Sequence, residues 1–214
     1  MKIIALEGID GSGKTTQSRI LFQELKEKLK TSVNLYECCS KDNFWGEIIK
    51  KLYSAESDST LRPIGRPRAI QELLYGLCAR ANFRKINPTS DSIVVSDRSI
   101  MTAYASHYGQ LPSWYISLLE PRVIPDLVFF LDIEPKVGLE RIANRGIRLL
   151  DEELGSLVNF RDTYFELMER NRPACLAKVQ FKVVDGHQTV EEVHNQIRAE
   201  LEGYLNLERR VIET

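Results

Sequence analysis

A glycine-rich segment near the start of the chain carries a lysine and a threonine at a spacing that suits phosphate binding. Residues 8–15, GIDGSGKT, fit the pattern G-x-x-x-x-G-K-[ST]. The glycines let consecutive backbone N–H groups face one anion, while Lys14 can reach the outer phosphates and Thr15 can hold Mg²⁺. The sequence therefore predicts a nucleoside triphosphate site. Its predicted contacts are Gly8, Asp10, Gly11, Ser12, Gly13, Lys14, Thr15 and Thr16.

A second chemical pair, Asp97-Arg98, follows the apolar run SIVVSD at residues 92–97. The carboxyl ends of parallel strands are where α/β sheets place their ligands. An aspartate there can hold magnesium-bound water, and the adjacent arginine can grip a phosphate with two hydrogen bonds. We find no guanine-reading NKxD sequence. The two motifs together favour a small-molecule kinase over a GTPase.

Length and composition are those of one globular domain, which we assign to residues 1–214. Lys and Arg total 29 against 30 Asp and Glu, so no basic field points to a nucleic-acid partner. No apolar run approaches the roughly 20 residues of a membrane span. None of the four cysteines forms a C-x-x-C pair, so we expect reduced thiols and a cytoplasmic location.

The elements that must position these motifs alternate between apolar runs and amphipathic stretches, as in βαβ units around a parallel sheet. We expect strands at residues 2–7, 33–37, 92–97, 126–132 and 180–185. We expect helices at residues 14–30, 44–54, 68–86, 113–120, 135–145, 152–172 and 189–205. The polar stretch at 54–68 contains two prolines and is interpreted as a loop. The predicted class is α/β.

Three segments together resemble the thymidylate kinase family. They are LEGIDGSGKTTQ at 6–17, the Asp97-Arg98 pair, and PDLVFFLDIEPKVGLERIANRG at 125–146. The resemblance runs from residue 2 to about residue 200. It implies a P-loop NTPase fold with a five-stranded parallel sheet, helices on both faces and a helical lid at about 142–160. It also implies ATP and Mg²⁺ as cofactors, a small nucleotide acceptor and a homodimer.

The resemblance assigns further roles around the donor. Arg145 and Arg148 resemble the lid arginines of bacterial members, and Arg141 and Arg161 flank the same stretch. Gly186 lies in VVDGHQTVEEVHNQI, which is similar to the family's adenine-contacting loop. Phosphoryl transfer relies on positioning and on cations around the transferred group. The predicted catalytic residues are therefore Lys14, Asp97, Arg98, Arg145 and Arg148, and Thr15 and Asp97 are the predicted metal site.

The acceptor side departs from the family pattern. Cys38 replaces the arginine expected after the second strand, Gly76 replaces the aromatic that stacks on the base, and Ser99 replaces the tyrosine after Asp97-Arg98. Asp10 matches the position near the acceptor's 3′-hydroxyl and phosphate, and Arg80 matches the base-contacting arginine. The predicted acceptor-binding residues are Asp10, Glu37, Lys41, Arg80, Thr102 and Tyr104.

These departures leave three functions open. The first is a kinase that converts dTMP to dTDP in a diverged acceptor pocket. The second is a deoxynucleoside kinase in which Glu37 acts as general base, which the loss of the phosphate-gripping arginine favours. The third is a nucleotide-binding switch without catalysis. The lid arginines argue against the third, because a sensor has no transition state to stabilise.

Overall fold

The computed structural model describes residues 1–38, 40, 42–53, 68–86, 89–106, 112, 114–116, 124–144, 153–170 and 172–212. The predicted loop at 54–68 and most of the predicted helix at 113–120 lie outside these residues, apart from Arg68 at a helix start and a helical stretch at 114–116. Three predicted site residues, Lys41, Arg145 and Arg148, also lie outside them.

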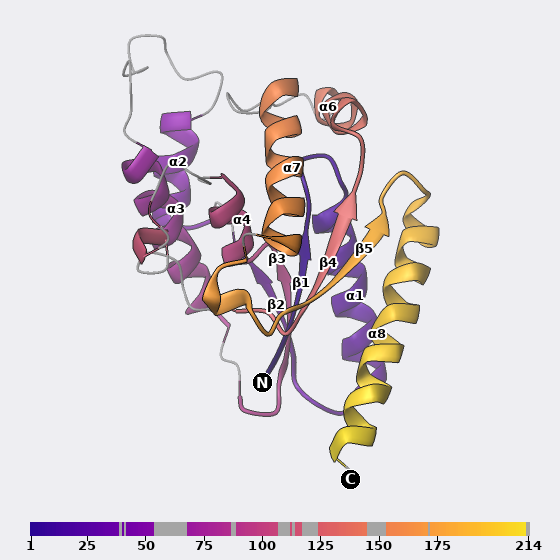
Figure 1. Ribbon diagram of the computed structural model, residues 1–214. Coiled ribbons are helices and arrows are strands. Elements are labelled where there is room, and N and C mark those ends of the chain that lie inside the picture. The colour runs from indigo at the N-terminus through magenta and orange to yellow at the C-terminus, as the bar shows by residue number, and fades with distance from the viewer. Residues whose placement is uncertain are drawn as a thin grey trace.

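The centre of the fold is a five-stranded sheet in which every neighbouring pair is parallel (Figure 1). Its strands are β1 (Lys2–Glu7), β2 (Val33–Glu37), β3 (Ile93–Asp97), β4 (Leu127–Asp132) and β5 (Gln180–Asp185). Their spatial order is β2-β3-β1-β4-β5. The chain thus crosses from one side of β1 to the other after β3, and this reversal creates the crevice in which such sheets bind ligands. The predicted five-stranded α/β fold is confirmed.

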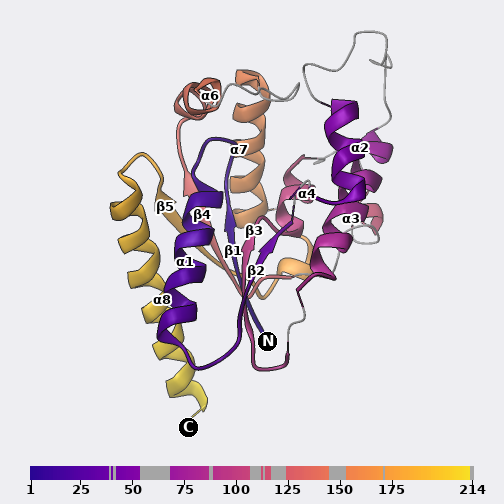
Figure 2. The same cartoon turned by 180° about the vertical axis from the view of Figure 1, so that it is seen from behind.

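Helices cover both faces of the sheet. They are α1 (Lys14–Lys28), α2 (Phe44–Tyr53), α3 (Arg68–Phe83), α4 (Ile100–Ser106), α6 (Pro135–Ala143), α7 (Leu154–Glu169) and α8 (Val190–Ile212), with a 3₁₀ turn at Ala174–Leu176. Helices α1 and α8 lie along one face, and α2, α3, α4 and α7 lie on the other (Figures 1 and 2). Helix α6 lies beyond the carboxyl ends of the strands, at the top of Figure 1.

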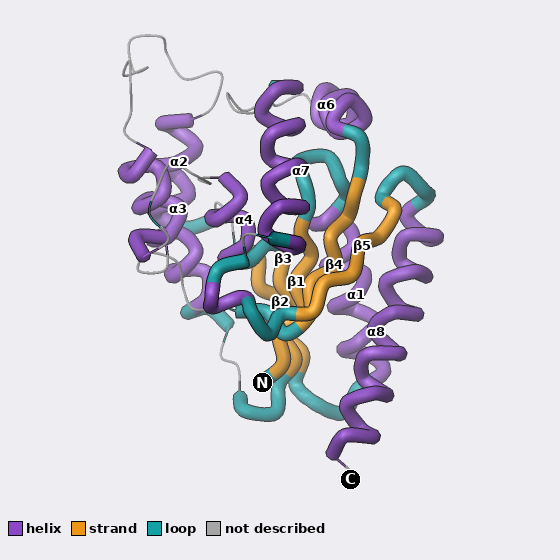
Figure 3. Tube along the Cα trace, in the orientation of Figure 1, coloured by secondary structure: helices purple, strands orange, loops and turns teal. Residues whose placement is uncertain are grey.

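Strand β1 lies within the sheet, between the two helical layers (Figure 3). Its side chains point alternately to one layer and to the other. Ile4 and Leu6 pack with α1 and α8, whereas Ala5 packs with α4 and α7. Alternate residues of a strand point to opposite faces, so Glu7 points to the same side as Ala5. Glu37 pairs with Asp97 in the register of β2 and β3, which brings the ends of these strands together at one edge of the sheet.

Helix α4 was not predicted from the sequence, and several helix ends differ by a few residues. Five of the seven residues of α4 are buried, so its sequence IMTAYAS shows no polar face to reveal a helical period. Helix α8 continues to Ile212, beyond the predicted end at 205. No helix among the described residues is both long and apolar enough to cross a bilayer.

Candidate functional site

The turn between β1 and α1 has the backbone geometry of a phosphate cradle. Gly11 has a φ of 83°, and a Cβ there would lie 2.5 Å from the carbonyl oxygen of Gly138 at the start of α6. Only glycine fits this close approach. Gly13 precedes α1 with a φ of 98°, and the first turn of α1 contains no acidic residue. The N–H groups and positive dipole end of α1 therefore face the turn, as anion binding requires.

Lys14 lies inside this turn and is almost fully buried, with its side chain 5% exposed. Its Nζ donates a hydrogen bond of 2.7 Å to the carbonyl oxygen of Ile9 and lies 3.9 Å from Asp10 Oδ1. Burial lowers the pKa of Lys14 from 10.5 to about 8, and the positive charge of Arg98 acts in the same direction. The ammonium group of Lys14 is thus held in a buried place where a bound anion would compensate its positive charge.

Thr15 and Asp97 meet at the carboxyl end of β3. Thr15 Oγ1 donates a hydrogen bond of 2.6 Å to Asp97 Oδ2. The other carboxylate oxygen, Oδ1, is buried and has no hydrogen-bond partner among the described residues. A buried carboxylate oxygen without a donor is costly unless a ligand, water or ion satisfies it. The hydroxyl and this oxygen are the hard oxygen donors that suit Mg²⁺ and its water shell.

Arg98 brings a second cation to this phosphate-binding turn, the P-loop (residues 8–15). Its backbone has a φ of 72°, in the left-handed region that is uncommon for residues other than glycine. Its Nη2 donates a hydrogen bond to Asp10 Oδ1, the same oxygen that faces Lys14. The carboxylate of Asp10 therefore lies between the two cations, and all three side chains line the place where phosphates would bind.

The loop after β5 is joined to the P-loop by Arg141. The guanidinium of Arg141 donates bonds of 3.1 Å to the carbonyl oxygen of Gly186 and one of 3.3 Å to that of Gly11. His187 also fixes this loop, because its Nε2 accepts a 2.9 Å bond from the N–H of Glu134. The predicted adenine loop thus lies next to the phosphate turn, and Arg141 connects the two.

Among the predicted acceptor residues, Glu37 lies at the end of β2 and accepts bonds of 2.9 and 2.7 Å from Arg19 of α1. Arg80 is exposed on α3. Between these elements, Asn82 donates to the carbonyl oxygens of Cys38 and Ser40, at 3.1 and 2.8 Å. These amide hydrogen bonds fix the backbone around Cys38, which stands where the resemblance leads us to expect an arginine.

The chain matches the family model for thymidylate kinase over residues 6–197. The chain belongs to the thymidylate kinase family. A probable thymidylate kinase of Sulfolobus acidocaldarius is 28% identical over 210 residues, which are 96% of this chain and 99% of the relative. A probable thymidylate kinase of Thermococcus onnurineus is 31% identical, over 93% and 96% of the two chains. A thymidylate kinase of Carboxydothermus hydrogenoformans is 31% identical, over 94% and 97%.

Two of the acceptor residues suggested by the thymidylate kinase resemblance contact other side chains of the protein, Thr102 from a half-buried position and Tyr104 from a buried one. Thr102 Oγ1 donates a 2.7 Å bond to Glu7 Oε2. Tyr104 is 4% exposed, and its hydroxyl lies 3.6 Å from Cys175 Sγ. Both side chains therefore interact with other parts of the protein on the α4 side of the sheet.

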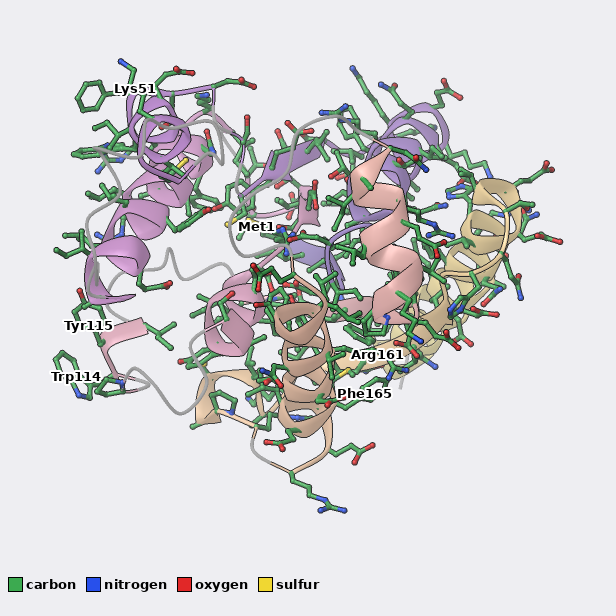
Figure 4. All side chains as sticks on the ribbon, turned by 90° about the horizontal axis from the view of Figure 1, so that it is seen from above. Met1, Lys51, Trp114, Tyr115, Arg161 and Phe165 are labelled. Carbon is green, nitrogen blue, oxygen red and sulfur yellow. The ribbon has the colours of Figure 1, made fainter. Side chains whose placement is uncertain are left out.

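Arg161, which flanks the candidate lid of this thymidylate kinase family member, is held at the end of β4. It donates bonds of 2.6 and 2.8 Å to the carboxylate of Asp132, and its guanidinium lies 5.1 Å from the ring centre of Phe165 (Figure 4). The ion pair raises the pKa of Arg161 above its ordinary value. Arg161 fastens α7 to the sheet.

Sequence reasoning gave no role to Glu7, although its position was informative. A charged residue ends β1 after four apolar, buried residues, and such a residue is rarely buried without partners. Gly138 was also missed: it allows α6 to approach the P-loop, and a Cβ there would lie 2.7 Å from the carbonyl oxygen of Asp10. A glycine in the first turn of a helix was the available signal.

Proposed function

We propose that this protein transfers the γ-phosphoryl group of ATP to dTMP and releases ADP and dTDP. The observation that carries the proposal is the family match over residues 6–197, which includes the P-loop, the Asp97-Arg98 pair and the candidate lid. Curated relatives called thymidylate kinase cover nearly the whole chain. The phosphate cradle and the two cations beside it suit this chemistry.

The donor site follows from the P-loop geometry. The N–H groups of the turn and Lys14 bind the β- and γ-phosphates, and Gly186 and Arg141 border the adenine. Thr15 and Asp97 would hold Mg²⁺, and the buried Oδ1 of Asp97 supports this assignment. When bound, the ion would neutralise phosphate charge during the transfer.

The transferred phosphoryl group carries charge on three oxygens, so cations must surround it. Arg98 supplies one of them from the end of β3, opposite Lys14. Arg145 and Arg148 supply the others from the segment between α6 and α7. In this arrangement Asp10 orients Arg98 toward the acceptor phosphate, because it binds the guanidinium directly.

The acceptor lies between the P-loop, β2 and α3. Arg80 contacts its base or sugar, and Lys41 supplies a cation for its phosphate in place of the missing arginine. Glu37 borders the site from the end of β2, while Thr102 and Tyr104 form the packing behind it. The Arg19 guanidinium occupies Glu37 Oε1, which does not favour Glu37 as a general base.

A substrate panel tests this function. ADP release is measured with dTMP, thymidine, other nucleoside monophosphates and no acceptor. We expect turnover with dTMP and a loss of at least about a thousandfold for Lys14→Ala, which removes the cation on the transferred group. Turnover with thymidine alone, abolished by Glu37→Gln, would select the deoxynucleoside kinase. ATP binding without turnover on any acceptor would select the switch.

The protein also exposes several large apolar side chains. Ile70 and Leu73 on α3 are 49% and 38% exposed, and Phe44 on α2 is 70% exposed. Trp114 is 67% exposed and lies next to Tyr115 at the edge of the molecule (Figure 4). A homodimer that buries Ile70 and Leu73 of α3 is the proposed assembly, and light scattering of wild type and Leu73→Glu tests it. The cytoplasmic location stays a prediction that cell fractionation can test.

A further inference from the structure

The carboxylate of Glu7 lies in the interior, directly below the P-loop. Glu7 ends β1 and is fully buried, and its side chain points toward α4 and α7. A buried charge is costly unless hydrogen bonds compensate it. The mechanism proposed above does not use Glu7, so its charge needs a separate explanation.

Four donors surround this carboxylate, two on each oxygen. Oε1 accepts bonds of 2.6 Å from both the N–H and the hydroxyl of Ser99. Oε2 accepts bonds of 2.7 Å from the hydroxyls of Thr102 and Tyr164. An ionised carboxylate accepts up to four such bonds, so the arrangement fits the anion. Burial raises the pKa of Glu7, and the hydroxyls of Ser99, Tyr164 and Thr102 and the nearby Arg98 charge oppose that change.

One of these bonds fixes the backbone next to Arg98. The left-handed conformation of Arg98 is unfavourable for a residue with a side chain and must be held by its surroundings. Its own N–H donates a 3.1 Å bond to the carbonyl oxygen of Leu6, and its carbonyl oxygen accepts a bond from Ser96 Oγ. The N–H of the next residue, Ser99, is held by Glu7. This turn directs the Arg98 side chain to Asp10.

A second bond connects α7 to the same carboxylate. Tyr164 lies in the middle of α7, and its ring packs 5.0 Å from the rings of Phe130 and Phe160. Its hydroxyl reaches Glu7 across the sheet-facing side of the helix. Glu7 therefore joins three parts of the fold: the strand that leads into the P-loop, the turn that presents Arg98, and α7.

We propose that Glu7 is a positioning residue for phosphoryl transfer. This proposal rests on the proposed kinase function. Its carboxylate holds the Arg98 turn, so that the guanidinium stays beside Asp10 and Lys14 at the phosphate site. Tyr164 and Thr102 hold the carboxylate in the orientation that this requires. Glu7 acts through Arg98, not on the substrate.

Glu7→Gln tests the proposal, because the amide keeps the size of the side chain but its NH₂ cannot accept hydrogen bonds. The NH₂ group then takes the place of one carboxylate oxygen and faces two of the four groups that donate to Glu7 in the wild type. We expect kcat to fall about tenfold or more, while the KM for ATP changes less than about threefold. In a double-mutant cycle with Arg98→Met, adding Glu7→Gln should lower kcat by less than about twofold further. Losses of kcat that multiply in the double variant would overturn the proposal.

Tyr164→Phe keeps the test decisive if Glu7→Gln does not fold, since it removes one donor and leaves the carboxylate. We expect kcat to fall about threefold or more, with a loss that disappears in the Arg98→Met background. Thr163→Val is the matched control, because the Thr163 hydroxyl bonds to the backbone of Asn159 in the same helix. If Tyr164→Phe kept the kcat of this control, Glu7 would have no positioning role.

These comparisons are made relative to the wild type, with whichever acceptor it turns over best. Failure of the wild type to use dTMP would contradict the proposed function. The double-mutant cycle of Glu7→Gln and Arg98→Met would still test the role of Glu7 with another acceptor. Equal kcat in wild type and both variants, at normal wild-type turnover, would contradict the role of Glu7 alone.

Discussion

ATP binding should take up a proton at Lys14 when the pH is above neutral. Burial and the Arg98 charge lower the pKa of Lys14 to about 8 in the free protein, so Lys14 is a neutral amine in a fraction of the molecules. Phosphate oxygens at hydrogen-bond distance favour the ammonium form and raise the pKa of the complex. If only the ammonium form binds, uptake is about 0.1 proton at pH 7, about half at pH 8 and about 0.9 at pH 9.

The same titration sets the size of the change in affinity. The apparent Kd for ATP should rise about tenfold between pH 7 and pH 9. Calorimetry with a non-hydrolysable ATP analogue, in phosphate-free buffers of different ionisation enthalpy, measures both quantities. Lys14→Met should abolish the uptake, and Lys26→Met, which changes an exposed lysine on the same helix, should preserve it. Uptake that persists in Lys14→Met, or an affinity that is constant from pH 7 to 9, would refute the assignment.

Linkage also predicts the stability of the free protein. Because the pKa of Lys14 in the folded state lies below the 10.5 of the unfolded chain, the unfolded state binds more protons between these values. The free energy of unfolding therefore contains a penalty of about 3 kcal/mol below pH 8, which is relieved as the pH rises toward 10.5. Denaturant unfolding of wild type and Lys14→Met at pH 7 and pH 9.5 measures this penalty. The difference in the free energy of unfolding between the two proteins should be smaller at pH 9.5.

Two further predictions concern the contacts around the P-loop. Arg141→Met should raise the KM for ATP about tenfold and leave that for dTMP nearly unchanged, because it frees the Gly186 loop from the phosphate turn. An equal rise in both KM values in steady-state kinetics would show that Arg141 does not act on the donor side. Gly138→Ala should weaken ATP binding by about tenfold, because its Cβ meets the backbone of Asp10 and overpacking of this kind costs about 1–3 kcal/mol. Calorimetric titration measures it, and unchanged affinity would mean that α6 can shift without moving the turn.

The strands could be predicted closely because each is a short apolar run between turn signals. The observed bounds of β1, β2 and β5 are those expected, and β3 and β4 each begin one residue later. The P-loop was equally accessible, since eight consecutive residues determine its geometry. Helix α4 was missed for the opposite reason: its buried residues surround the helix, and periodicity detects only an element with one polar face.

The directions of polar side chains could not be predicted from spacing. Thr102 was expected at the acceptor because it follows Asp97-Arg98, yet its hydroxyl binds Glu7. The partner of Glu7 on α7, Tyr164, lies 157 residues away along the chain. Such contacts depend on how α4 and α7 pack against the sheet, and no local pattern encodes that packing. The pairing of Glu37 with Arg19 is of the same kind.

This difference gives a physical reason for the departures from the family pattern at the predicted acceptor positions, while the P-loop keeps that pattern. The donor half depends on backbone N–H groups and on Lys14 and Thr15 within one turn, so almost any substitution there damages phosphate binding directly. The acceptor half, as proposed, is assembled from β2, α3 and the end of β3, where one side chain can substitute for another that reaches the same place. Asp10 connects the halves, because its one oxygen faces both Lys14 and Arg98. We therefore expect a change in the proposed acceptor pocket to be tolerated as long as it leaves the Arg98 turn in place.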